Sequence, residues 1–321
     1  PPPPPTPQHS SAASDVYKRQ HHPLIFRGLK RITGQSSVER MVELAIKKDI
    51  AIYALHTNLD NVNSGVNKIL CDKIGLEKLK ILDPKGGLLC KLVTFAPGEH
   101  ADKVRTALFE AGAGEIGEYD SCSFNLEGTG TFRGSDQSNP FVGEKGKLNY
   151  EKEVRIEVIC KKFLENKIIN ALMKAHPYEE VAYDIYPLEN TLVSVGAGMI
   201  GELPAEMKEL NFLNHVKKVT GTGCIRHSEL TGRKIRKVAV CGGAGSFLIS
   251  KAIRAKADVF ISGDIKYHDF FMAEKQLVIA DIGHYESEQF VKELIYSELI
   301  KKFPNFAVLI SEANTNSVNY L

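Results

Sequence analysis

Along residues 36–75, the spacing of apolar positions predicts two helices separated by a short strand. Behind a capping box formed by Ser36 and Glu39, apolar residues recur at helical spacing and predict a helix that ends near Asp49. The apolar run 50–55 has the length of a strand, and the polar loop 56–60 follows it directly. A second helix is expected from about Ser64, ending at Gly75.

An internal repeat marks a separate module between residues 89 and 188. Residues 103–120 (KVRTALFEAGAGEIGEYD) align without gaps on residues 167–184 (KIINALMKAHPYEEVAYD), and each copy predicts a helix that runs into a strand. Strands expected at 91–96 and 153–160 complete a β-α-β-β-α-β order, which is ferredoxin-like, with a Gly/Ser/Asn-rich segment over 127–147 between the halves. We therefore expect an inserted domain over 89–188.

The residues after the insert return to alternating strands and helices. Short β-branched runs at 238–241, 259–262 and 278–281 are separated by helical stretches and predict a mostly parallel sheet covered by helices. Ligands of such sheets bind at the carboxyl ends of the strands. The predicted fold is an α/β core, built from residues 21–88 and 189–321, that carries the ferredoxin-like insert.

The first twenty residues differ from the rest. They contain five consecutive prolines and no apolar periodicity, so we expect them to be disordered, and no continuous apolar stretch of about 7–15 residues marks a secretory signal. Two origins remain open: a natural Pro-rich tail, or translated adapter sequence, which SAASDVYKRQ resembles. We favour the second because no strand is predicted before His21-His22-Pro23 to hold these histidines.

Composition and charge exclude several classes of protein. The chain has 321 residues, of which 43% are hydrophobic and 25% charged, and no stretch approaches the roughly 20 apolar residues of a membrane span. With 41 Lys and Arg against 39 Asp and Glu, it lacks the basic footprint of a nucleic-acid binder. The six cysteines are far apart in the sequence without a C-x-x-C pair, which favours a reducing cytoplasm over a disulfide framework.

Histidines and carboxylates at strand ends are candidate metal ligands. His284 and Glu288 are four residues apart at the start of a predicted helix and project from one face, although such pairs also occur on solvated faces. In His21-His22, extended backbone would point one ring toward a metal and the other into packing. Asp60 is a ligand, a helix cap or a turn former. Nitrogen and oxygen donors suit Zn, Mn, Fe or similar divalent ions.

Two further motifs have simpler interpretations. The glycines of residues 242–245 follow a strand, but Leu248 stands where a dinucleotide fingerprint has its third glycine, so a phosphate-contacting loop is the favoured alternative. The segment HPYEE at 176–180 lies in the insert and is typical of a connection between a helix and a strand that proline interrupts.

Four blocks of sequence together resemble a known family. They are HHPLIF at 21–26, HTNLD at 56–60 with the following Gly65-Val66-Asn67, SGDIKYHD at 262–269 and GHYESE at 283–288. They resemble the dinuclear-metal-centre family of GTP cyclohydrolase type-two homologues, also called NGG-interacting-factor-three-like. The insert, with KLVTF, GTGTFRG and AHPYEEVAYDIYPLEN, is similar to the PII/CutA-like module of the longer bacterial members.

The resemblance implies a fold, a ligand set and an assembly. It implies a two-lobed α/β core with a PII/CutA-like insert, a homohexamer, and two divalent metal ions. The implied ligands are His21, His22, Asp60, His284 and Glu288. Glu288 would be shared between the ions, and His56 and His268 would face the substrate or support the ligands. Family members have a strand-helix-strand segment before HHP, which the tail replaces here, so we expect an N-terminally truncated chain.

The expected function is that of a metal-dependent hydrolase. Its substrate would be a nucleotide or a related phosphorylated heterocycle, with GTP cyclohydrolase chemistry implied by the family and phosphoester hydrolysis served by the same site. The alternative is a non-enzymatic metal-binding protein with a regulatory or scaffold role.

Overall fold

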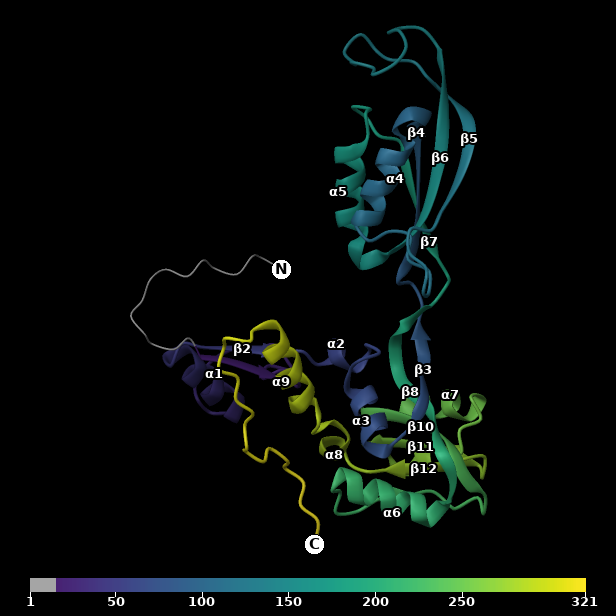
Figure 1. Cartoon of the computed structure of the whole chain (residues 1–321). Helices are drawn as coiled ribbons and strands as arrows, with labels where there is room; N and C mark the ends of the chain where they lie inside the picture. Colours follow the sequence, from purple (N-terminus) through teal and green to yellow (C-terminus); the bar gives the residue numbers. More distant parts are fainter. Residues whose placement is uncertain (1–15) are drawn as a thin grey trace. The chain divides into compact units, whose positions relative to one another are not determined.

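The computed structural model describes residues 16–321, and these divide into two compact units. One unit comprises residues 84–193, compared with the 89–188 expected for the insert, and the other comprises the rest of the described chain. Figure 1 labels the elements of both units. Within residues 16–321, no helix combines the length and the apolar character needed to cross a bilayer.

A six-stranded sheet forms the centre of the larger unit. Its strands lie in the order β3-β8-β10-β11-β12-β9. Their bounds are β3 (Glu77–Lys85), β8 (Leu192–Lys208), β9 (Arg226–His227), β10 (Lys234–Ala244), β11 (Val259–Gly263) and β12 (Val278–Asp281). The strands β10, β11 and β12 are parallel, as expected, but β8 and β9 pair antiparallel with β10 and β12. The sheet is therefore mixed, whereas the sequence pattern predicted a mostly parallel one.

Side chains that alternate along the central strands build two cores, one on each face of the sheet. Val238 and Val240 of β10 pack with α6 on one face, while Ala239 and Cys241 pack with α7 on the other. Figure 1 shows α6 and α7 on these opposite faces. The helices are α3 (Val66–Ile74), α6 (Glu209–Thr220), α7 (Ile249–Arg254), α8 (His284–Glu288) and α9 (Val291–Lys302). Because both faces are covered, the strands are buried and their ends are fixed in place.

The segment before β3 forms a small sheet of its own. β1 (Val16–Gln20) pairs parallel with β2 (Ile50–Ala54), and α1 (Ser37–Lys47) and α2 (Thr57–Asp60) flank β2 in the sequence. The capping of α1 is confirmed, since the Glu39 N–H donates to the Ser36 side chain, and Gly75 ends α3 with a φ of 85°.

The strand β1 corrects the expectation for the first twenty residues. We expected no strand before His21, but residues 16–20 form one, because their backbone pairs with residues 50–54 despite a mostly polar sequence, VYKRQ. Residues 1–15 of the expected disordered tail lie outside the described residues.

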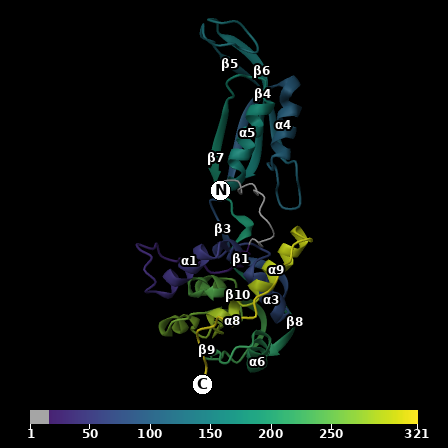
Figure 2. The same cartoon turned by 90° about the vertical axis from the view of Figure 1, so that its left-hand side faces the viewer.

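The inserted unit contains the predicted β-α-β-β-α-β order. It consists of β4 (Leu89–Pro97), α4 (Ala101–Glu110), β5 (Ser123–Phe132), β6 (Asn149–Lys161), α5 (Glu165–Ala175) and β7 (Tyr183–Leu188). Its antiparallel sheet has the order β5-β6-β4-β7, and α4 and α5 cover one face (Figure 2). Cys90 and Cys160, 70 residues apart in the sequence, face each other across β4 and β6 with Sγ atoms 2.8 Å apart.

Candidate metal centre

Two adjacent histidines leave β1 toward the carboxyl ends of the central strands. The pairing of β1 with β2 continues past the strands, because the His56 N–H donates to the His21 carbonyl at 2.8 Å. The His21 side chain is buried, with 5% of its surface exposed, whereas that of His22 is 52% exposed. Both rings nevertheless lie near the same carboxylate, so neither is only a packing residue.

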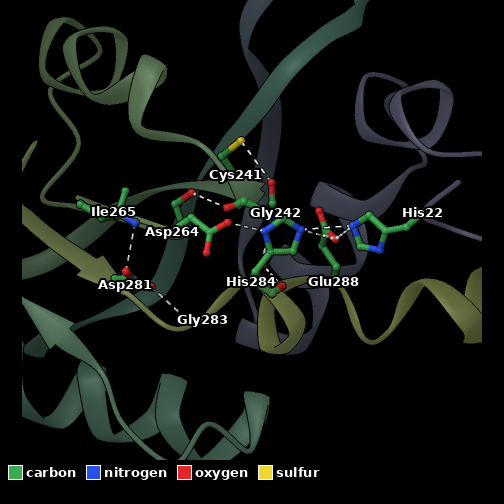
Figure 3. Close-up of polar contacts among 12 residues, drawn as sticks. His22, Cys241, Gly242, Asp264, Ile265, Asp281, Gly283, His284 and Glu288 are labelled. Carbon is green, nitrogen blue, oxygen red and sulfur yellow. Dashed lines mark hydrogen bonds and ion pairs between the residues drawn. The ribbon is translucent and has the colours of Figure 1, made fainter. Parts of the chain in front are cut away.

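That carboxylate belongs to Glu288 in the short helix α8. Its Oε2 lies 3.1 Å from His22 Nε2, 3.2 Å from His284 Nε2 and 3.5 Å from His21 Nε2. Figure 3 shows the carboxylate between the rings of His22 and His284. The spacing of four residues places His284 and Glu288 on one face of α8, as the sequence predicted.

Asp60 completes the group from the end of α2. Its Oδ1 lies 3.2 Å from His21 Nε2. The sequence predicted a polar loop over 56–60, but residues 57–60 form the short helix α2. Its position is fixed by Asn67 of α3, whose Nδ2 donates to the Asp60 carbonyl at 2.9 Å while its Oδ1 accepts from the Gly242 N–H, also at 2.9 Å. Asn67 therefore connects the end of α2, which carries Asp60, to the end of β10.

Several donor atoms of this group could serve as metal ligands. Both ring nitrogens of His21 and Glu288 Oε2 are buried without a hydrogen bond inside the described part of the chain, although charged atoms lie close to them. Donors held about 2.0–2.2 Å from one tetrahedral ion lie roughly 3.3–3.6 Å apart. Glu288 Oε2 lies 3.1 Å from His22 Nε2 and 3.5 Å from His21 Nε2, near this range, and the ligand atoms of the three residues all lie within 4.8 Å of one another, so His21, His22 and Glu288 could hold a divalent metal ion.

Electrostatics in the group reflect the close packing of carboxylates and rings. Burial lowers the pKa of His21, but Asp60 and Glu288 outweigh burial and raise it to about 9. The Glu288 carboxylate, opposed by burial and aided by Asp264, raises the pKa of His284 to about 9. Burial raises the pKa of Glu288, but the three surrounding histidines hold it well below its usual range.

Asp264, at the end of β11, is a residue of the site that the sequence analysis did not assign. Its Oδ2 lies 2.7 Å from His284 Nδ1, on the side of the ring away from Glu288 (Figure 3). The contact fixes the orientation of the ring and leaves Nε2 facing His22 and Glu288. Its place at a strand end, in the motif SGD, was the signal in the sequence.

The glycines after Val240 have a role that neither interpretation of the motif included. Gly243 has a φ of 65°, and a Cβ atom there would lie 2.4 Å from Glu288 Oε1 and 3.3 Å from the His284 ring. Its N–H donates to Ser287 Oγ at 2.8 Å, which connects β10 to α8. Glycine at this position therefore allows the helix carrying two of the proposed ligands to approach the strand.

His56 lies beside the group, but His268 does not. The His56 ring centroid is 5.5 Å from that of His21 and 5.4 Å from that of His22. His268 is exposed on the 3-10 helix Tyr267–Ala273, where its ring neighbours Tyr267 and Phe271, and in the described residues it contacts none of the proposed ligands. The role of His268 in the site stays a prediction.

Fold and site together define an α/β protein with a group of histidines and carboxylates, able to hold a metal ion, at the carboxyl ends of its central strands. The family model of Duf34/NIF3 (NGG1p interacting factor 3) matches residues 20–317. The chain belongs to this family.

Similar proteins extend along nearly the whole chain. A Halalkalibacterium halodurans protein named GTP cyclohydrolase 1 type 2 homolog is 42% identical over 94% of this chain and 82% of its own length. A Bacillus subtilis protein of the same name is 41% identical with the same coverage. The crystal structure of a Bacillus cereus protein related to NIF3 has a TM-score of 0.81 and 40% identity, covering 95% of this chain and 83% of that one.

Proposed function

We propose that this chain is a hydrolase dependent on two divalent metal ions, with a nucleotide or a related phosphorylated heterocycle as its substrate. The observation that carries the proposal is the convergence of His21, His22 and Glu288, with buried ring and carboxylate atoms that lack hydrogen bonds in residues 16–321. A GTP cyclohydrolase-like reaction is the form that the names of the relatives suggest.

The contacts of the proposed ligands fall into two sets, which supports two ions rather than one. His21 Nε2 pairs with Asp60 Oδ1 at 3.2 Å, and His22 Nε2 lies 3.2 Å from His284 Nε2. Glu288 Oε2 is near both sets, within 3.5 Å of all three ring nitrogens. Glu288 would accordingly be shared between the ions.

The chemistry proposed for the site depends on a fixed set of donors next to an accessible surface. Divalent ions supply Lewis acidity and lower the pKa of water, which makes water a nucleophile near neutral pH. Asp264 would hold His284 in one orientation, and Asn67 would hold the loop of Asp60. His56, half-buried beside His21 and His22, is placed to face a substrate and to accept or donate a proton.

The test combines metal analysis with turnover. The purified chain is loaded with Zn, Mn or Fe, its metal content is measured by elemental analysis, and it is assayed on a panel of nucleotides, GTP included, and phosphoesters. The Glu288→Gln variant serves as the background control. We expect two equivalents of metal and hydrolysis of at least one substrate class above that background, and light scattering of the same sample tests the proposed homohexamer.

The panel also separates the two classes of function. A folded chain that retains its metal and hydrolyses nothing above the background of the variant would contradict the enzymatic proposal. That result would favour a metal-binding regulatory or scaffold protein.

A further inference from the structure

The inserted unit contains a cavity, and none of the proposed metal ligands belongs to this unit. Its volume is about 300 Å³, at the lower end of the range for pockets that bind small molecules. It is lined by the end of β5, the loop that follows it, Glu153 of β6, and the segment between α5 and β7. These are the GTGTFRG and HPYEE segments, to which the metal centre assigns no role.

Hydrogen bonds hold the walls of the cavity together. The Tyr178 hydroxyl donates to Glu153 Oε1 at 2.9 Å, and the Asn139 N–H of the loop donates to Glu179 Oε1 at 2.7 Å. The Phe141 and Tyr178 rings lie 6.2 Å apart. At Gly130 a Cβ atom would lie 2.2 Å from Glu153 Oε2, so a larger residue there would displace this carboxylate.

The segment that carries Tyr178 is anchored by a buried histidine. The His176 ring accepts from the Tyr178 N–H at 3.1 Å through Nδ1, and its Nε2 lies 2.9 Å from the Phe95 carbonyl, to which it donates. Because Nδ1 accepts a hydrogen bond, the His176 ring is neutral and adds no positive charge beside the cavity; burial lowers its pKa in the same direction.

The lining combines aromatic rings with negative charge. Phe132, Phe141 and Tyr178 contribute rings, Glu153, Glu179 and Glu180 contribute carboxylates, and no lysine, arginine or histidine lines this cavity in the described residues. Over residues 16–321 none of these three carboxylates forms an ion pair. Burial and the nearby Glu153 also raise the pKa of the Tyr178 hydroxyl, because the carboxylate disfavours a second negative charge beside it.

This lining disfavours an anion and does not have the form of a metal site. Across residues 16–321, the group of histidines, cysteines and carboxylates with the spacing of metal ligands is His21, His22 and Glu288, and no such group lines the cavity. Aromatic faces attract cations, and a carboxylate adds a charge-assisted hydrogen bond to an N–H donor. We propose that this cavity binds a small organic cation, namely a protonated amine attached to an apolar or aromatic body.

The first test compares three probes of similar shape and different charge on the full chain. They are 2-phenylethylammonium, neutral 2-phenylethanol and anionic 3-phenylpropanoate, and their dissociation constants are measured by ligand-observed NMR titration. We expect the cation to bind at least about tenfold more tightly than either of the others, because only it gains the charge-assisted hydrogen bond. Equal binding of the three probes, or no binding of the cation at concentrations up to approximately 10 mM, would overturn the proposal.

Variants then locate the binding. Glu153→Gln keeps an acceptor for Tyr178 but removes the charge, and we expect about tenfold weaker binding of the cation. Glu180→Gln, at an exposed position of the lining, is a second variant that does not risk the fold, and it is expected to weaken binding in the same direction. Glu127→Gln is the matched control, since Glu127 is exposed on β5 and does not line the cavity.

The outcomes of the variants are decisive in both directions. Circular dichroism confirms that each variant is folded. Weaker binding in the two lining variants with unchanged binding in the control supports the proposal. Unchanged binding in both lining variants, or an equal loss in the control, would mean that the amine binds elsewhere on the chain and would overturn it.

Discussion

Replacing Glu288 by glutamine tests the proposed metal centre most directly. The substitution keeps the size of the side chain and removes its negative charge, which lies within 3.5 Å of three imidazole nitrogens. Two unit charges about 4 Å apart attract by about 4 kcal/mol at an effective dielectric constant of about 20, and a divalent ion doubles this attraction. The amide dipole retains part of it, so we expect a loss of at least about 3 kcal/mol, or about 100-fold in the dissociation constant of one ion.

The matched control is the neighbouring Glu286→Gln. Glu286 belongs to the same helix and has the same exposure of 6%, but its Oε1 accepts from Asn316 Nδ2 at 3.0 Å. Metal content by elemental analysis and affinity by calorimetric titration are compared for both variants, with circular dichroism to verify folding. If the Glu288→Gln variant retained two equivalents of metal with unchanged affinity, the shared-ligand assignment would be refuted, and with it the reasoning that leads to a dinuclear site.

Three further predictions concern the surroundings of Glu288. The folded-state pKa values of His21 and His284 are raised to about 9, above the usual 6.5, so protonation of these rings stabilises the metal-free fold below pH 6.5, and this stability is lost as the pH rises through 9. Metal loading at pH 7 should therefore release about two protons, measured by calorimetry in buffers of different ionisation enthalpy. Release of no protons would contradict this prediction. Asp264→Asn should weaken metal binding about 10- to 100-fold while the chain stays folded, since the side chain is 56% exposed and asparagine tolerates its φ of 55°. Unchanged affinity would show that the contact with His284 does not matter. Gly243→Ala should lower the free energy of unfolding by about 1–3 kcal/mol and reduce metal content, because the new methyl group meets the Glu288 carboxylate, and a melting curve equal to that of the parent would disprove the close approach.

The elements that the sequence predicted well are those whose signals are local. The capping box at Ser36 and the left-handed glycine at 75 set the limits of α1 and α3 because each requires only its own neighbours. The strands around 238–241, 259–262 and 278–281 appear because strands that are buried on both faces are apolar throughout. The order of elements in the insert was predicted from its internal repeat, in which each copy is a helix followed by a strand.

The elements that the sequence missed depend on contacts between distant residues. β1 has the mostly polar sequence VYKRQ and exists through its backbone pairing with residues 50–54. The apolar pattern of β8 does not determine whether this strand pairs parallel or antiparallel with β10, so the mixed sheet could not be predicted. Cys90 and Cys160 likewise meet only because β4 and β6 pair in one register.

The same division holds for the candidate site. His284 and Glu288 were recognisable from a spacing of four, and the strand ends from their positions, but the closeness of His21 to Asp60 is a property of the folded chain. The functions of Asp264 and Gly243 also become visible only when α8 is seen against the ends of β10 and β11. The sequence therefore predicted types of donor, while the structure describes their arrangement.

The energetic cost concentrated at this end of the sheet is itself an argument for a ligand. Within the described residues, the buried side-chain polar atoms without a hydrogen bond are His21 Nδ1, His21 Nε2 and Glu288 Oε2, and an unpaired buried polar atom costs about 1–3 kcal/mol. His21 Nε2 and Glu288 Oε2 lie 3.5 Å apart, and their attraction offsets part of this cost when the ring is protonated. His56, whose ring lies beside that of His21, adopts a φ of 34°, which is unfavourable for a residue with a side chain. Packing alone would not select for such a concentration of strained and unsatisfied groups. A bound cation would satisfy the orphaned nitrogen and oxygen atoms together, and this is why the geometry favours a metal centre over a solvated cluster of histidines.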